Sequence, residues 1–328
     1  MYMYIFRRAL MMIPTLIAIS VVTFIIIQLP PGDFLTTLVS SLSSQGETVN
    51  QDALDALKRQ YGLGEPMYMQ YLIWMRNILF HFDFGDSFEY NRPVRDLIGG
   101  RMAWTVGISV GSIIVTWLIA FPLGFYSAVR KYTPGDYLMT FLSFLGLAIP
   151  EFMLALLLLY VSYKYFGQSV GGLFSPEYID AAWSFDKAID LASHLWIPIL
   201  IIGASSTAGL VRIMRANLLD ELNRPYVVTA RAKGLSERQL LIKYPVRLAL
   251  NPFVSTVGWT LPSIVSGEAI VAIVLSLPTV GPLLLRSLQS QDMYLAGSII
   301  LLTSVLTVIG TLLSDILLAW LDPRIRLM

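Results

Sequence analysis

The sequence predicts an all-α integral membrane protein with six transmembrane helices. Hydrophobic residues make up 55% of the 328 residues and charged residues only 14%, and the mean hydropathy is +0.66, which is too apolar for a soluble domain of this size. The apolar residues also gather in six long stretches, and about 20 helical residues match the thickness of the hydrocarbon core of a bilayer. These stretches are continuous, whereas a transmembrane barrel needs segments of about ten alternating residues, so we expect helices.

The six predicted spans differ in strength. The first follows Arg7 and Arg8, as the apolar run of a signal peptide would, but it is long enough to cross a bilayer and no small-x-small cleavage site follows, so we expect a retained span. The fourth is short before Arg212, whose long side chain can snorkel to the interface, and the fifth is interrupted by Pro262 and Glu268. The predicted limits are 9 to 29, 102 to 128, 138 to 163, 195 to 214, 253 to 277 and 295 to 320.

The basic residues predict an orientation with both termini inside. With the N-terminus inside, the two short outer loops carry only Lys164, Lys187 and Arg286. Basic residues of short loops concentrate on the cytoplasmic side of membrane proteins, so this asymmetry predicts an N-in, C-in arrangement. The segments on the inner side then carry Arg7, Arg8, Arg130, Lys131, Arg212, Arg215, Arg224, Arg231, Lys233, Arg238, Lys243, Arg247, Arg324 and Arg326.

This arrangement divides the chain into three parts. Residues 1–29 hold the N-terminus and the first span, residues 30–101 form an extracytoplasmic insertion, and residues 102–328 form a five-span core with a cytoplasmic coupling loop at 217–249. No short repeat and no low-complexity linker divides the chain further.

The insertion between the first two spans has helical patterns of its own. They lie at residues 51–61 and 67–80, with a Gly62-x-Gly64 turn between them. Two roles stay open for this insertion, a lid over the external mouth and a platform for a substrate-delivery protein.

The coupling loop contains a basic, non-hydrophobic segment that reads PYVVTARAKGLSERQLLIKYPVRLALNP from residue 225 to residue 252. Two short helices are expected to meet at Gly234, because glycine suits the left-handed position after a helix end. Ser236 and Gln239 form an S-x-x-Q capping box for the second helix, and Pro245 limits that helix to about two turns. Such a helix could transmit force from a soluble partner to the spans, or its charges could serve only to fix topology.

The spacing T-A-R-A-K-G-L-S-E-R resembles the cytoplasmic "EAA" loop in the inner-membrane subunits of bacterial ABC importers, and in particular of the dipeptide/oligopeptide/nickel permease family. The general Glu-Ala-Ala triplet is Val228-Thr229-Ala230 here, so its acidic position is missing, which is usual in peptide-type permeases. Further blocks lie in the family order over nearly the whole chain: FRRALMMIPTLIAISVVTF, Pro31-Gly32-Asp33, YGLGEPMYMQYLIWMRNILFHFDFGDSF, RPVRDLIGGRMAWT, LSLPTVGPLL and LDPRIRLM.

The resemblance implies a multi-pass permease subunit of the bacterial cytoplasmic (inner) membrane. Such a subunit forms half of the pathway for a peptide-like or related small solute, and alternating access is driven by partners. The implied partners are a homologous second permease subunit, two cytoplasmic ATPase subunits that bind ATP and Mg, an extracytoplasmic solute-binding protein and the lipid bilayer. The positions implied to dock on an ATPase are Thr229, Ala230, Arg231, Ala232, Lys233, Gly234, Leu235, Ser236 and Arg238.

Catalytic and cofactor motifs are missing from the sequence. It has no cysteine and only two histidines, His81 and His194, which do not support a metal site, and it has no G-x-x-x-x-G-K-[ST] phosphate loop or H-E-x-x-H motif. The net charge of +1 gives no nucleic-acid signature, because the basic residues sit at membrane edges and in one loop. We therefore expect a subunit without catalysis, without a cofactor of its own and without a nucleic-acid partner.

Two carboxylates are candidates for the translocation pathway. Glu268 lies among apolar residues of the fifth span, where a charge costs about 2–3 kcal/mol, so it should face the pathway or a polar partner such as the neighbouring subunit. The resemblance lends it little support, because the family's usual acidic position falls at Ala272. Pro150 and Glu151 predict a kink in the third span with a carboxylate at the pore mouth, and a structural role close to the membrane boundary is the alternative.

Other functions stay open at this stage. Thr279 replaces the second residue of the P-G-x-G common in peptide-type relatives, which leaves an oligosaccharide or an opine as alternative substrates. An ion-coupled secondary transporter is a more remote alternative, since such folds commonly carry internal repeats and here one candidate acid and no repeat are visible. A non-transporting scaffold or sensor would show no solute flux at all.

Overall fold

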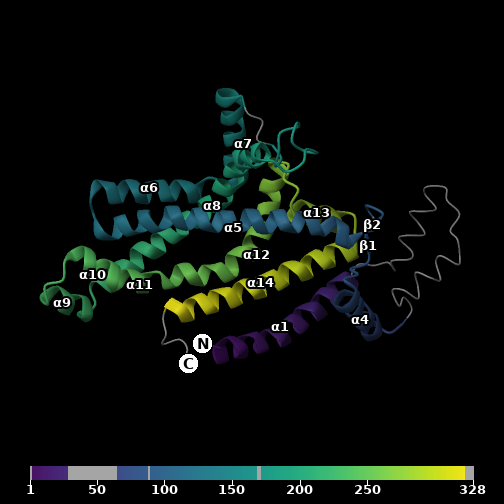
Figure 1. Ribbon diagram of the computed structural model, residues 1–328, viewed down its shortest axis with the longest axis horizontal. Coiled ribbons are helices and arrows are strands. Elements are labelled where there is room, and N and C mark those ends of the chain that lie inside the picture. The colour runs from purple at the N-terminus through teal and green to yellow at the C-terminus, as the bar shows by residue number, and fades with distance from the viewer. Residues whose placement is uncertain (1, 29–64, 88, 168–170, 322–328) are drawn as a thin grey trace. The chain divides into compact units, whose positions relative to one another are not determined.

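A computed structural model describes residues 2–28, 65–87, 89–167 and 171–321 (Figure 1). The side chains of residues 2, 27, 166, 205 and 258–268 are outside the described set. The predicted helix at 51–61 and the Gly62-x-Gly64 turn also lie outside the described residues.

Helices make up most of the described chain, as expected for an all-α membrane protein (Figure 1). One antiparallel pair of two-residue strands interrupts them, with Asp86 opposite Pro93. In chain order the elements are α1 (Tyr2–Gln28), α4 (Met67–Arg76), the π-helix η1 (Asn77–His81), β1 (Asp86–Ser87), β2 (Arg92–Pro93), α5 (Val94–Val129), α6 (Pro134–Ala148), α7 (Glu151–Val161), the π-helix η2 (Ser162–Phe166), α8 (Phe185–Leu222), α9 (Pro225–Ala232), α10 (Glu237–Lys243), α11 (Pro245–Ala249), α12 (Asn251–Val274), α13 (Val280–Gln289) and α14 (Met293–Leu321).

Four helices of the described chain are long and apolar enough to cross a membrane, and a bent helix pair can supply a fifth span. The four lie at Met3–Ile26, Val94–Val129, Phe185–Ala204 and Met293–Leu321, which overlap the predicted first, second, fourth and sixth spans. The predicted fifth span lies in α12, whose middle side chains are outside the described residues. The structure therefore supports an all-α membrane protein with four or five candidate spans, while the count of six and the N-in, C-in orientation stay predictions.

The predicted third span is a broken helix. The expected kink at Pro150 is present, but the axes of Pro134–Ala148 and Glu151–Tyr165 differ by 101° (Figure 1). Proline lacks an N–H and disfavours a helical conformation in the preceding residue, and Ile149 accordingly adopts an extended backbone with φ −90° and ψ 122°. A break of this size divides the stretch from 138 to 163 into two separate helices.

Two compact units make up the chain. Residues 1–12, 103–282 and 306–328 form one unit, and residues 13–102 and 283–305 form the other. In the first unit α8 packs against α6, α7, α11 and α12. Helix α5 also lies close to α8. A Cβ on Gly124 of α5 would lie 2.6 Å from the Cβ of Met214 of α8, so the two helices can approach this closely only because position 124 has no side chain.

The second unit holds the amphipathic stretch predicted at 67–80, which is helical as α4 and η1. Asp292, which is buried, accepts hydrogen bonds from the Ser87 hydroxyl and from the backbone N–H of Glu89 (3.2 Å). Glu89 in turn pairs with Arg286 at 3.1 Å. These bonds attach the β1–β2 hairpin to the turn between α13 and α14.

Candidate functional site

The loop between α8 and α12 folds into the three short helices α9, α10 and α11. Two of these helices meet at Gly234, as predicted, and Pro245 ends the second after seven residues. Proline also occupies the first position of α9 and α11, where a missing N–H costs nothing and its fixed φ is already helical. Proline and glycine thus set the boundaries of this loop.

Gly234 forms the turn between α9 and α10. Its φ is +79°, the left-handed region that L residues with a side chain rarely adopt. The Gly234 N–H donates to the Arg231 carbonyl (3.0 Å), and the Leu235 N–H donates to the Ala230 carbonyl (3.4 Å). This pair of bonds is a Schellman motif, which satisfies carbonyl groups at the end of α9 and reverses the chain in one step.

A small hydrophobic cluster holds α9 and α10 together. Val227, Ala230 and Leu240 are buried, and Leu235 and Tyr244 pack against them. Ala230 is therefore a packing residue inside the loop. Its small side chain allows α10 to lie close to α9.

The predicted capping box is wrong. Ser236 is the N-cap of α10 by its extended backbone, but its side chain makes no capping hydrogen bond with any described residue. Instead the Arg231 guanidinium donates to both carboxylate oxygens of Glu237, with Nε–Oε1 at 2.6 Å and Nη2–Oε2 at 3.2 Å. This hydrogen-bonded pair spans the turn and holds the pKa of the Glu237 carboxyl below its usual range.

Polar contacts fasten both ends of the loop. The Tyr226 hydroxyl donates to the Glu221 carboxylate at the end of α8, and burial together with this carboxylate raises the pKa of Tyr226. At the other end the Arg247 guanidinium donates to the carbonyl of Leu321 at the end of α14 (3.1 Å). The loop is thus tied to the ends of two long helices.

Apolar packing reinforces these ties. Val246 and Ala249 of α11 belong to a buried cluster with Met214 and Leu218 of α8 and Phe253 of α12. Because packed interiors resist deformation, a displacement of the loop would be passed directly to α8 and α12.

A groove of about 870 Å³ lies beside the loop. The basic side chains of Lys233, Lys243 and Arg247 line it together with apolar side chains that include Leu235 and Leu248. Its lining combines positive charge with apolar surface, which suits an acidic and partly apolar protein segment.

Most of the predicted docking positions are on the surface. Ala230 is buried and Leu235 is half-buried. Sequence reasoning missed Val228 and Ile242, apolar residues that are 57% and 60% exposed on the short helices. Each directly follows another apolar residue, so the local sequence gives no signal that marks it as exposed. The exposed predicted positions are Thr229, Arg231, Ala232, Lys233, Gly234, Ser236 and Arg238.

The two predicted pathway carboxylates lie on other elements. Glu151 is half-buried in the first turn of α7, where the positive end of the helix dipole favours a carboxylate. The side chain of Glu268 lies outside the described residues. Neither residue is part of the loop.

The described part of the chain shows no group of metal ligands and no nucleophile elbow. Residues 2–28, 65–87, 89–167 and 171–321 contain no group of three or more His, Cys, Asp or Glu placed to hold a metal ion. Gly107-x-Ser109-x-Gly111 has the spacing of a hydrolase elbow, but it lies inside α5, and buried Ser109 donates to the Thr105 carbonyl. A nucleophile elbow requires a strand-to-helix turn, so this pattern has another meaning here.

Two family models match the chain. Residues 1–109 match the N-terminal part, and residues 120–327 match the main part, of the binding-protein-dependent transport system inner membrane components. The chain belongs to this family. It is the inner-membrane permease subunit of a bacterial ABC importer, a multi-pass and non-catalytic component that works with ATPase and solute-binding protein subunits. The family assignment favours this identity over a secondary transporter or a scaffold.

Several named permeases are similar to this one over their full length. The chain is 36% identical to the oligopeptide transport system permease protein AppB of Bacillus subtilis, over 98% of this chain and 99% of AppB. It is 30% identical to the glutathione transport system permease protein GsiC of Escherichia coli K12, over 98% of both chains. It is 29% identical to the oligopeptide transport system permease protein OppB of Haemophilus influenzae, over 99% of this chain and 100% of OppB.

Proposed function

We propose that this permease forms half of a translocation pathway for peptide-like solutes and works by alternating access. The observation that carries the proposal is the full-length similarity to permeases named for oligopeptides and for glutathione, a small peptide. A homologous second permease subunit completes the pathway, and two cytoplasmic ATPases supply the energy. Six spans with both termini inside, an extracytoplasmic insertion at 30–101 and a cytoplasmic loop at 217–249 are the topology of this proposal.

In this proposal α9 and its turn dock on an ATPase. The exposed face of Val228, Thr229, Ala232 and the turn at Gly234 supplies the contact surface, flanked by the basic side chain of Arg238. Complementary charge raises the association rate and selects the partner more than it adds affinity. The cluster of Val227, Ala230 and Leu240 keeps the face in one shape before docking.

Movement of the loop would reach the spans through the hydrogen bonds and the apolar packing at its two ends. Closure of an ATPase dimer would push α9, and the packing of Val246 and Ala249 on Met214 and Leu218 would carry that push into α8 as a rigid-body movement. Alternating access then needs only two positions of α8 and the helices packed on it.

The test uses the full transporter in liposomes, with ATP hydrolysis and uptake of a labelled oligopeptide measured in the same vesicles. Arg238→Glu should lower the number of peptides moved per ATP several-fold. The matched control is Lys131→Glu, a basic residue that is also exposed, in the turn between α5 and α6, and it should leave the ratio unchanged. Unchanged coupling in Arg238→Glu, or equal losses in both variants, would rule out this docking surface.

The substrate class is tested separately. Labelled di- and oligopeptides should be taken up in an ATP-dependent manner, with unlabelled peptide competing. ATP-dependent uptake of an oligosaccharide or an opine that peptides do not compete with would overturn the substrate class and leave the coupling mechanism standing.

A further inference from the structure

The outer face of α4 and η1 is a large exposed apolar surface. Tyr68, Leu72 and Leu79 recur along it at helical spacing, and Phe80 and Phe82 extend the surface at the end of η1. Each is more than half exposed, although such residues would ordinarily be buried. Phe80 is 77% exposed and Phe82 65%, the highest values of the set. We call the set the α4 stripe, and it consists of Tyr68, Leu72, Leu79, Phe80 and Phe82.

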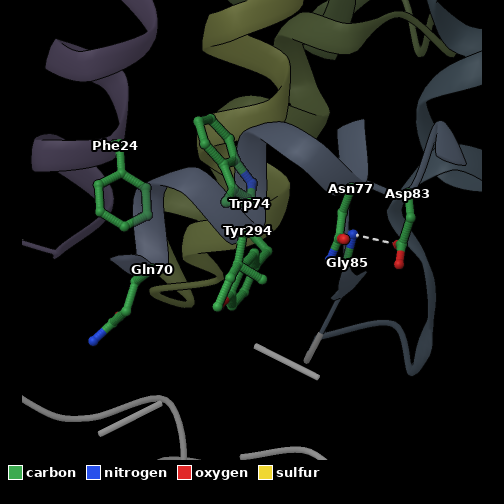
Figure 2. Close-up of a pocket in the computed structure, with 8 residues that line it drawn as sticks. Phe24, Gln70, Trp74, Asn77, Asp83, Gly85 and Tyr294 are labelled. Carbon is green, nitrogen blue, oxygen red and sulfur yellow. Dashed lines mark hydrogen bonds between the residues drawn. The ribbon is translucent and has the colours of Figure 1, made fainter. Parts of the chain in front are cut away.

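The opposite face of α4 is firmly packed, which fixes the direction of the stripe. Trp74 is buried, and its ring lies 5.7 Å from that of Phe24 in α1. Phe24 also meets the ring of Tyr71 edge-on at 5.6 Å. Figure 2 shows Phe24, Trp74 and Tyr294 around a small pocket on this inner side. The stripe therefore cannot turn inward without losing the contacts of Trp74.

Hydrogen bonds place α4 at the end of α1. The Ser20 and Tyr71 hydroxyls share a hydrogen bond of 2.7 Å, and the Gln28 amide donates to the Gln70 side-chain oxygen at 3.0 Å. Gln28 is the last residue of α1, and Figure 1 shows α4 beside this end. The polar end of a transmembrane helix lies in the headgroup region, so α4 lies at that depth.

Much of the surface of α1 is also apolar and exposed. Residues 3–26 are the most hydrophobic of the candidate spans, and only a small share of their most apolar stretch is buried. Ile17, Val22 and Ile25 are exposed in the part of α1 that belongs to the same unit as α4. A span with so little protein contact must be covered by lipid or by other subunits along this face. The apolar surface of α1 thus continues into the interface, where α4 adds its own.

The backbone at the end of η1 holds apolar side chains at the surface. Phe82 adopts φ +51°, a left-handed conformation that is disfavoured for a bulky residue, and its N–H donates to the Ile78 carbonyl (3.2 Å). Ile78 is buried, whereas Phe82 and Phe80 project to the surface. A strained turn thus holds two phenylalanines at the surface.

We infer that α4 and η1 form an interfacial helix, with the α4 stripe inserted among the lipids of one leaflet. Tyr and Phe side chains suit this depth, and Arg76, exposed beside the stripe, is long enough to reach the lipid phosphates. The bilayer is favoured over a protein partner because the stripe continues the exposed apolar surface of α1. This inference depends neither on the docking of an ATPase nor on which side of the membrane α4 faces.

This chain contains no cysteine, so a single-cysteine variant carries one thiol in this subunit, and the thiols of the partner subunits are blocked before assembly. Leu72→Cys and Phe80→Cys in the full transporter, labelled with a nitroxide in liposomes, report access of oxygen, which concentrates in lipid, and of a water-soluble nickel chelate. Tyr68→Cys provides a third stripe position if one variant fails to assemble. Arg92→Cys, exposed on β2 of the same unit, is the matched control.

The stripe labels should show an oxygen-to-nickel access ratio several-fold higher than the label at Arg92. Preferential access of the nickel chelate at Leu72 and Phe80 would overturn the inference. So would exclusion of both reagents at these sites, because it indicates that protein covers them. Nickel access that falls only when the soluble solute-binding protein is added would also overturn it.

Discussion

The Asp136 carboxylate accepts two hydrogen bonds from the Arg215 guanidinium, with Nε–Oδ1 at 3.0 Å and Nη2–Oδ2 at 2.8 Å, and so joins α6 to α8. Asp136 is only 2% exposed. The same carboxylate accepts the Tyr132 N–H (2.9 Å), while the Thr133 hydroxyl caps the N-terminus of α6 by accepting the Asp136 N–H (3.4 Å). This buried pair connects the helix that continues into the coupling loop with the first half of the broken helix pair.

Removing one partner of this pair should destabilise the permease. Asp136→Asn leaves the Arg215 charge without its bidentate acceptor, and breaking a buried pair costs about 3–5 kcal/mol. Arg215 is 28% exposed and can recover some hydration, so we expect a loss at the lower end of that range, measured by thermal unfolding in detergent. The control is Arg224→Ala, whose pair with Glu221 is exposed on the arginine side and should contribute about 0–1 kcal/mol. Equal losses in both variants would contradict this view of the pair.

Substitutions at Gly234 should weaken the coupling of ATP hydrolysis to transport by different amounts. No described atom lies within 4 Å of a Cβ built on Gly234, so the penalty comes from the φ of +79° and not from crowding. Asn tolerates this conformation best, Ala pays about 1–2 kcal/mol, and Pro, fixed near −65°, cannot adopt it. Peptides moved per ATP should therefore fall in the order Gly, Asn, Ala, Pro. The same ratio in all four proteins would show that the turn has no part in coupling.

The Arg231–Glu237 pair should make the turn sensitive to acid. Because Arg231 lowers the pKa of Glu237, the stabilisation is present above the unfolded pKa, near 4.5, and is lost as pH falls through the lower folded value. Mobility of a nitroxide at Ala232→Cys should stay constant at neutral pH and rise only in acid. Glu237→Gln should show the higher mobility at neutral pH and no further rise in acid. A mobility change centred between pH 6 and 8 would exclude this pair as the cause.

The charge of Glu268 should matter for transport more than for assembly. Glu268→Gln removes a charge that costs about 2–3 kcal/mol within a span, so insertion should not suffer, while the uptake rate or the substrate-stimulated ATPase activity should change. Glu151→Gln, at the start of α7, is the companion variant. Uptake identical to that of the unaltered protein in Glu268→Gln would assign this residue a structural role.

Local chemistry made the conformation of the loop between α8 and α12 predictable. Gly234 and Pro245 impose their conformations whatever surrounds them, and both boundaries that they predict are present. The capping box failed because the Arg231 side chain reaches Glu237 across the turn, and a pair six residues apart in two helices has no helical spacing that marks it.

Features that depend on contacts between residues far apart in the chain could not be predicted from the sequence. Asp136 and Arg215 are 79 positions apart, so only the packing of α6 on α8 brings them together. Pro150 marked a kink, but the angle of 101° depends on how the two halves pack, which a single residue does not encode. The exposed Val228 and Ile242 were missed for a similar reason, because their exposure results from how α9 and α10 fold onto each other.

The most direct test of the proposed mechanism is to determine which side of the membrane α9 faces and whether the ATPase subunits cover it. A single cysteine at Ala232, an exposed position of α9, can be treated with a membrane-impermeant maleimide in vesicles of both orientations. We expect labelling only from the cytoplasmic side, and protection of the thiol when the ATPase subunits are assembled. Labelling from the outside, or labelling that the ATPases leave unchanged, would contradict a coupling role for this loop.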